Sequence, residues 1–275
     1  MKQNIKTTES VQIDGSIEIR FAGGNVIRQA PIATVDRQNA AGVAFSVSVD
    51  ALSEFQAEQS KVERDDELAT LGKTRRIEPL ALNCIDQLAN SYGAVVAFDA
   101  HLNKRDDVLL AVPQLLPGDV ANVSVDQEVR QWWRGLDIHG RADVMRRIDA
   151  GPELARIELA LLRSPIALAD AEIAVIRASW DRGRRAENPK EAVDIAAGLA
   201  SCAWAKRGLV QVAAAFRTSV DQHVWPDRRI LGHIVNSPNQ QVQAGFAVFG
   251  FDVLTVAEYR RQQAQTGIGA YQANS

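Results

Sequence analysis

The chain lacks the short motifs that mark common catalytic and cofactor sites. It contains no GxSxG nucleophile turn, no HExxH zinc helix, no GxGxxG dinucleotide loop and no CxxC pair. Gly72-Lys73-Thr74 resembles the end of a phosphate-binding loop, but Glu67 stands where that loop has its first glycine. We therefore predict no bound cofactor, while a site assembled from distant residues stays open.

Cysteines and long apolar runs are also scarce. Cys84 and Cys202 are the only cysteines and match no zinc spacing, so we expect a reducing compartment. No run of 18 apolar residues occurs, because charges interrupt the stretches 154–176 and 192–205. The first ten residues lack the apolar segment of a signal peptide. We expect no membrane span, and a location in the bacterial cytoplasm or within a bacteriophage particle.

Neither sign of charge dominates the chain. The 31 Lys and Arg and the 34 Asp and Glu give a net charge of -3, which argues against a surface devoted to nucleic acid. A local basic patch stays open, and its candidate phosphate contacts are Arg146, Arg147, Arg182, Arg184 and Arg185. Acidic residues lie close to each of them in sequence, so solvated helix ends are the alternative.

Apolar spacing changes along the chain. Hydrophobic residues make up 46% of it, as in globular proteins. Apolar and polar residues alternate in VQIDGSIEIRF (11–21) and GVAFSVSV (42–49), which is typical of strands, and helical spacing follows from about residue 50. We predict a mainly α fold: an irregular bundle of about seven or eight helices, with a short β-hairpin or extended arm at the N-terminus.

Capping chemistry predicts several helix starts and, with them, a division into segments. The start signals are Asn188-Pro189 before Glu191, Ser124 with Gln127, Ser237 with Gln240, and Thr255 with Glu258. Two prolines and a glycine mark a break near residue 120. The expected segments are an arm at 1–50, a helical segment at 51–120, a helical core domain at 121–254, and a C-terminal helix with a flexible tail at 255–275.

A tryptophan pair lies among arginines in DQEVRQWWRGLDIHGRADVMRRIDAG, residues 126–151. Helical spacing places Trp132 and Trp133 on one apolar face, so both are expected in the core. A helix-turn-helix motif would need apolar side chains at Arg130 and Arg141, so that match fails. The histidine that follows, at position 139, is expected in the link between two helices.

Two further stretches predict packing. Residues 191–205 are rich in Ala, Gly and Ser, which favours close helix packing within a subunit or between subunits. Residues 54–78 are heavily charged and predict one exposed helix with its own ion pairs. A short coiled contact with another chain is the alternative for that second stretch.

These observations favour a structural or assembly subunit that acts through protein–protein contacts, by self-association or with other protein subunits. Within that class we expect a component of a bacteriophage particle. One alternative is a nucleic-acid-associated helical protein that uses the five arginines. The other is an enzyme with a dispersed site, for which the nominees are Asp221, His223, Asp227 and His233. The ten-residue gap between these histidines matches no helical metal pair, so we predict no metal site.

Overall fold

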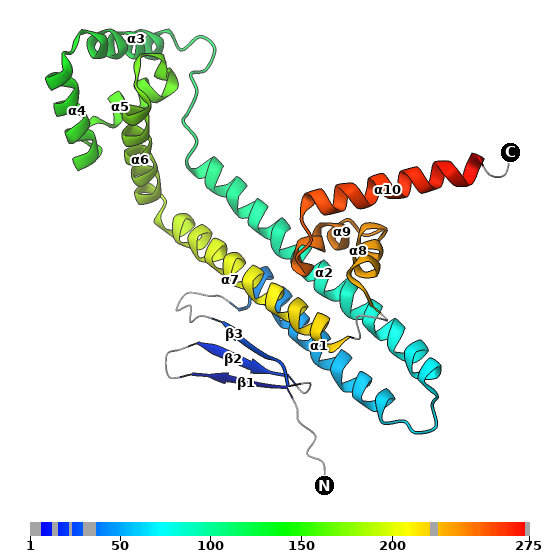
Figure 1. The fold of residues 1–275 in the computed structure, drawn as a ribbon. Coiled ribbons are helices and arrows are strands. Elements are labelled where there is room, and N and C mark those ends of the chain that lie inside the picture. Colours follow the sequence, from blue (N-terminus) through cyan, green and yellow to red (C-terminus); the bar gives the residue numbers. More distant parts are fainter. Residues whose placement is uncertain (1–6, 13–15, 22–23, 30–36, 221–224, 273–275) are drawn as a thin grey trace. The chain divides into compact units, whose positions relative to one another are not determined.

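The computed structural model describes residues 7–12, 16–21, 24–29, 37–220 and 225–272 of the chain. Within these ranges the protein forms ten α-helices and three short strands, so the predicted mainly α fold with a small N-terminal β element is confirmed (Figure 1). The chain separates into two compact units. Unit 1 comprises Met1–Leu102 and Ala197–Ser275, and unit 2 comprises Asn103–Ala196.

The strands of unit 1 form an antiparallel sheet in the order β1 (Thr8–Val11), β2 (Ile17–Arg20), β3 (Val26–Gln29). Ile19 and Ile27 pair across β2 and β3 and are buried. Glu18, one position along, accepts hydrogen bonds from Arg28 and Arg20, which lower the pKa of its carboxyl against the opposing effect of burial. The sheet thus has an apolar side and a side held by ion pairs.

The strand predicted at 42–49 is wrong, because these residues belong to the helix α1 (Ala40–Glu63). The side-chain oxygen of Asn39 accepts hydrogen bonds from the backbone N–H groups of Ala41 and Gly42, both at 3.0 Å, and so starts the helix. Alternation over a few residues is also compatible with helical spacing. The side chains that α1 buries do repeat at that spacing, and they include Phe45, Ser48, Leu52 and Phe55.

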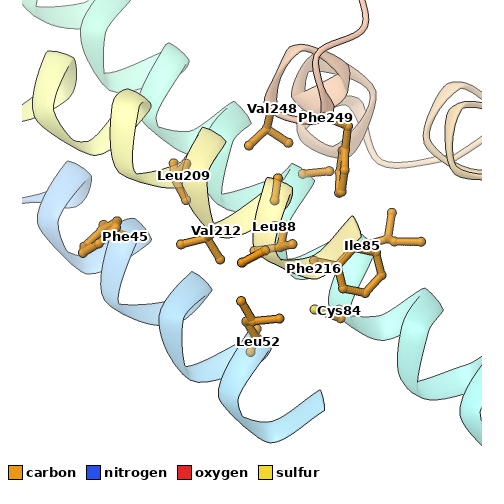
Figure 2. Close-up of a cluster of buried hydrophobic side chains, with 14 of the residues drawn as sticks. Phe45, Leu52, Cys84, Ile85, Leu88, Leu209, Val212, Phe216, Val248 and Phe249 are labelled. Carbon is orange, nitrogen blue, oxygen red and sulfur yellow. The ribbon is translucent and has the colours of Figure 1, made fainter. Parts of the chain in front are cut away.

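The core of unit 1 lies between α1, α2 (Thr70–Leu109) and α7 (Pro189–Ser219) (Figure 2). Around it lie α8 (Asp227–Val235), α9 (Gln240–Ala244), the 3-10 helix η3 (Gly245–Phe249) and α10 (Val253–Gln272). Figure 2 shows side chains from α1, α2, α7 and η3 meeting: Phe45, Leu52, Cys84, Ile85, Leu88, Leu209, Val212, Phe216, Val248 and Phe249.

Glycines allow backbones in unit 1 to approach closely. A Cβ atom at Gly93 would lie 2.2 Å from the carbonyl oxygen of Gln241, and one at Gly245 would lie 2.1 Å from that of Ala89. The helix α2 therefore packs backbone to backbone against the segment formed by α9 and η3.

The small-residue stretch at 191–205 also packs closely. A Cβ atom at Gly198 would lie 2.7 Å from Leu102, so the close helix packing predicted there is confirmed within the chain. In the same region of α7, Ser201 and Cys202 are fully buried.

Several predicted boundaries differ from those of the structure. The start of α7 at Pro189 is confirmed. The helices α3, α9 and α10 instead begin after Asp119, Asn239 and Asp252, whose side chains accept backbone hydrogen bonds. The single helix predicted at 54–78 is the end of α1, a turn and the start of α2. At the C-terminal end α10 continues to Gln272, where the sequence predicts a flexible tail.

Unit 2 has a core of its own. It contains α3 (Val120–Gly135), α4 (Ile138–Ala150), α5 (Ala155–Arg163) and α6 (Asp170–Glu187), with the short 3-10 helices η1 (Pro152–Leu154) and η2 (Pro165–Ala167). Its buried apolar residues are Trp133, Val144, Ile148, Leu161 and Ile176. None of the helices in the described part of the chain has the length and hydropathy needed to cross a bilayer.

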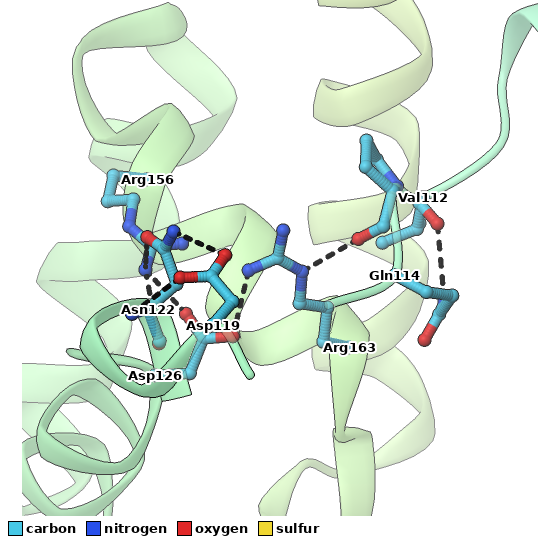
Figure 3. Close-up of polar contacts among 8 residues, drawn as sticks. Val112, Gln114, Asp119, Asn122, Asp126, Arg156 and Arg163 are labelled. Carbon is cyan, nitrogen blue, oxygen red and sulfur yellow. Dashed lines mark hydrogen bonds and ion pairs between the residues drawn. The ribbon is translucent and has the colours of Figure 1, made fainter. Parts of the chain in front are cut away.

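A buried ion pair joins α3 to α5 (Figure 3). The side chain of Asp126 is fully buried, and its two oxygens lie 2.7 Å from Arg156 and 3.0 Å from Arg163. The Nε atom of Arg163 also donates to the carbonyl oxygen of Pro113 at 2.7 Å. This arrangement fixes the segment before α3 against α5.

The close approach of α2 to the α9–η3 segment can be tested with Gly93→Ala. The new methyl group would overlap backbone atoms, so we expect the free energy of unfolding to fall by about 1–3 kcal/mol. Gly72→Ala in the same helix is the matched control, because its Cβ atom would meet only the side chain of Leu68, at 3.4 Å. Urea unfolding measures both variants. If Gly93→Ala and Gly72→Ala had the same free energy of unfolding, the close approach of α2 to the α9–η3 segment would be contradicted.

Candidate functional site

Four of the five arginines predicted to contact phosphate form ion pairs inside unit 2. The pairs are Arg146–Asp143, Arg182–Asp149, Arg184–Glu187 and Arg185–Asp106. Arg147 is exposed on α4. Because neighbouring carboxylates compensate most of these charges, the group attracts phosphate less than its arginine count suggests. Its role in nucleic-acid contact stays a prediction.

The four residues nominated for a dispersed catalytic site are not brought together among the described residues. Asp221 and His223 lie outside those residues. Asp227 accepts two hydrogen bonds from Arg217, at 2.7 and 2.8 Å. His233 instead lies 2.8 Å from Asp86 of α2, at the edge of a cleft of about 540 Å³. No sequence signal joins Asp86 to His233, because they are far apart in the chain.

The described residues offer no other obvious nucleophile or metal site. Burial raises the pKa of both cysteine thiols, that of Cys202 to about 11, so neither Cys84 nor Cys202 forms a reactive thiolate near neutral pH. Within the described ranges, no cluster of three His, Cys, Asp or Glu side chains could hold a metal ion.

The tryptophan pair of α3 separates into one core residue and one surface residue. Trp133 is fully buried, but Trp132 is 43% exposed, so the prediction that both lie in the core is wrong. Adjacent helical residues point about 100° apart, and only one of them can face a narrow core. His139 lies in the first turn of α4 and not in the link, because Asp137 caps that helix through the N–H of Gly140 at 2.7 Å.

Trp132 belongs to an apolar surface that we call the α3–α4 corner, formed by Val125, Trp132, Leu136, Ile138 and Met145. Val125 and Trp132 lie seven residues apart on one side of α3, and Leu136 directly follows the end of that helix. Leu136, Ile138 and Met145 line a groove of about 460 Å³ together with Arg141, Ala142 and Glu172. At the edge of this groove Ile138 is 79% exposed.

Arg141 is the unusual charged residue of that groove. Its guanidinium lies 5.5 Å from the centre of the Trp133 ring, and its Nε atom is buried without a hydrogen-bond partner in the described part of the chain. Across the groove Glu172 accepts a hydrogen bond from the N–H of Ala169 at 2.8 Å. The groove therefore contains one cation and one anion that form no ion pair among the described residues.

A second pocket of unit 2, of about 480 Å³, lies between the end of α4, α5 and α6. Glu158, which is only 2% exposed, contributes to its lining, and its Oε1 atom lies 3.1 Å from the hydroxyl of Ser179. Burial raises the pKa of Glu158, although the Ser179 hydrogen bond and the charge of Arg182 act in the opposite direction. We call this space the Glu158 pocket.

The hydroxyl of Ser179 lies between two acceptors, the carboxyl of Glu158 and a backbone carbonyl. Its Oγ atom also lies 2.9 Å from the carbonyl oxygen of Ile148, which can only accept a hydrogen bond. The hydroxyl has a single proton to share between these two acceptors, so its hydrogen bond offsets only part of the effect of burial on the pKa of Glu158. Sequence reasoning missed Glu158, although its position four residues after Leu154 and three before Leu161 places a carboxyl on the core stripe of α5.

Comparisons with known proteins supply no relative: no family model matches the chain, and no curated protein or solved structure is similar to it. A function must therefore be argued from the surfaces and pockets of the two units. In unit 2 these are the α3–α4 corner and the Glu158 pocket, and in unit 1 the cleft beside His233.

The raised pKa of Glu158 makes stability depend on pH in a defined direction. As pH rises above the ordinary value of 4.5, the unfolded chain loses this proton before the folded protein does, so folding stability falls until the folded group also ionises. Glu158→Gln removes this dependence. Each tenfold increase in proton affinity corresponds to about 1.4 kcal/mol.

Urea unfolding of the native protein and the E158Q variant between pH 4 and pH 8 tests this expectation. Relative to the variant, the native protein should lose stability as pH rises from 4.5 and then reach a plateau. Parallel stability curves across the whole range would show that Glu158 titrates normally.

Proposed function

We propose that this protein is a subunit of an assembly and acts through protein–protein contacts, with the α3–α4 corner as the surface that binds a second copy of the chain. The observation that carries the proposal is the apolar groove at Ile138, whose lining includes Arg141 and Glu172, a cation and an anion that form no ion pair among the described residues. Self-association is the mode of contact that this arrangement favours.

The composition of the corner supports a protein partner. Trp132 and Ile138 are large apolar side chains that remain exposed to water, and Ile138 lines a groove together with Leu136 and Met145. Tryptophan, methionine and arginine are enriched in protein interfaces, and a buried aromatic anchor often supplies much of the binding free energy. A phosphate backbone would gain little from these aliphatic side chains.

The charges of the groove support a second copy as that partner. In a two-fold symmetric dimer, residue i of one copy contacts residue j of the other, and each such contact occurs twice. Arg141 of one copy could then pair with Glu172 of the other, on both sides of a shared apolar centre. Such a pair would provide Arg141 with the carboxylate partner that it lacks among the described residues of its own chain.

The nucleic-acid alternative has less support, because four of its five arginines are already paired with carboxylates in unit 2. A place for this subunit in a bacteriophage particle stays a prediction.

Light scattering of the purified protein tests the proposal. We expect a mass of twice 30.0 kDa at high micromolar concentration, and a shift toward 30.0 kDa for Ile138→Asp, since a buried carboxylate would oppose the contact. Ile166→Asp is the matched control, because Ile166 is 88% exposed on η2 and lies outside the corner. That variant should keep the mass of the native protein.

Two outcomes would contradict the proposal. A native protein of 30.0 kDa would do so, as would an equal response of the two aspartate variants. Absorbance at 260 and 280 nm across the same peak, at low and moderate salt, identifies bound nucleic acid. A monomer carrying nucleic acid that salt removes would favour the alternative function.

A further inference from the structure

The Glu158 pocket has the size and lining of a small-molecule site. Its volume of about 480 Å³ lies within the usual range of ligand pockets. Trp180 contributes to its wall, and Cβ atoms added at Gly151 or Gly183 would meet no atom within 4 Å. Much of its lining comes from residues with little or no side chain: Ala150, Gly151, Ala155, Gly183 and Ala186.

The space continues the core of unit 2. On α6, Ser179 and Gly183 follow the buried Ile176 on the side of the helix that faces inward. A longer side chain at position 183 would fill this part of the pocket and extend the core. Glycine leaves the space open. An apolar group of a ligand could occupy this position and be buried against small side chains.

The charged groups around the pocket form no ion pair with Glu158 among the described residues, although the charge of Arg182 lowers its pKa. From α4 comes Asp149, and from α6 come Arg182, Arg184 and Glu187. Arg182 pairs with Asp149 and Arg184 with Glu187, so these four charges compensate one another. In the described part of the chain, the carboxyl of Glu158 accepts a hydrogen bond from Ser179, and no cation lies within salt-bridge distance of it. Once ionised, it would be a buried anion without an ion-pair partner of its own, because Arg182 is paired with Asp149.

We propose that the Glu158 pocket binds small amphiphilic primary amines, with the ammonium group paired to Glu158 and the apolar group lodged beside Gly183 and Trp180. This inference does not depend on self-association through the α3–α4 corner.

An ammonium ion suits this pocket better than other ligand groups. It would donate a charge-assisted hydrogen bond to the carboxylate and so offset the free-energy cost of burying that charge. An anionic ligand would meet the buried Glu158, while the arginines of the pocket are already paired with Asp149 and Glu187. A neutral alcohol would bury the same apolar group but leave the ionised carboxyl without a counter-ion.

Binding should depend on the protonation of Glu158. Because burial raises the pKa of this carboxyl, affinity for an amine should increase as pH rises and Glu158 ionises. The other charged groups that face the pocket are Arg182 and Arg184, which form ion pairs with the exposed carboxylates of Asp149 and Glu187. The pH dependence is therefore assigned to Glu158.

Isothermal titration calorimetry with phenethylamine and phenethyl alcohol tests the proposal on the full chain. These probes share their aromatic group, and only the first is a cation at neutral pH. We expect the amine to bind at least about tenfold more tightly than the alcohol, which corresponds to about 1.4 kcal/mol. Glu158→Gln should abolish this preference. Glu153→Gln, at an exposed position five residues earlier, should retain it.

Gly183→Leu provides an independent variant, because its side chain would fill the space beside Trp180 and weaken both probes without altering Glu158. Thermal unfolding confirms that each variant is folded before titration. Absent binding of phenethylamine would overturn the proposal, as would equal affinity for the two probes or an amine preference retained by E158Q. Unchanged binding to G183L would place the probes elsewhere and equally refute the assignment. Repeating the titrations on I138D, the variant expected to be a monomer, shows whether amine binding depends on the oligomeric state.

Discussion

Close packing through small residues is the constraint on which the arrangement of unit 1 depends. At Gly93 and Gly245 the backbones of α2 and the α9–η3 segment approach so closely that a methyl group would overlap carbonyl oxygens. Dispersion contacts are maximised by this approach, and side chains from four elements can then meet in one core. Small residues have a different effect in unit 2: a Cβ atom at Gly183 would meet no atom of the described residues within 4 Å, and a pocket lies there.

Unit 2 contains two buried carboxylates whose neighbours differ, and this difference distinguishes a structural group from a candidate binding group. Asp126 lies between two arginines, which offset the cost of its burial and join α3 to α5 (Figure 3). Glu158 is buried to a similar extent but has a neutral hydroxyl beside it and an open pocket along one side. The first group needs no further partner, whereas the second gains one if a cation binds.

The sequence predicts the helical class and the start at Pro189 because capping chemistry and periodicity act over a few residues. It misleads at 42–49, where alternation is too short to exclude the helical spacing of Phe45, Ser48 and Leu52. A division of the sequence into consecutive segments cannot describe unit 1, because that unit combines residues from the two ends of the chain. That unit depends on long-range contacts that local patterns do not encode.

Among the candidate sites too, local sequence patterns can locate residues within one stretch but not contacts between distant parts of the chain. Both sides of the α3–α4 corner come from one continuous stretch, and helical spacing could have separated the exposed Trp132 from the buried Trp133. Glu158 could have been found as a carboxyl on an apolar stripe. The contact between Asp86 and His233 joins residues 147 positions apart, and no spacing rule predicts it.

Hydrogen exchange measured at low and high protein concentration tests the central claim, self-association through the α3–α4 corner, most directly. Dilution favours the monomer, so amides covered by a second copy should exchange faster in the dilute sample. We expect this concentration dependence in peptides from the end of α3 and the first turns of α4, and none in the sheet or in η2. Protection that does not change with concentration, or changes only outside the corner, would contradict it.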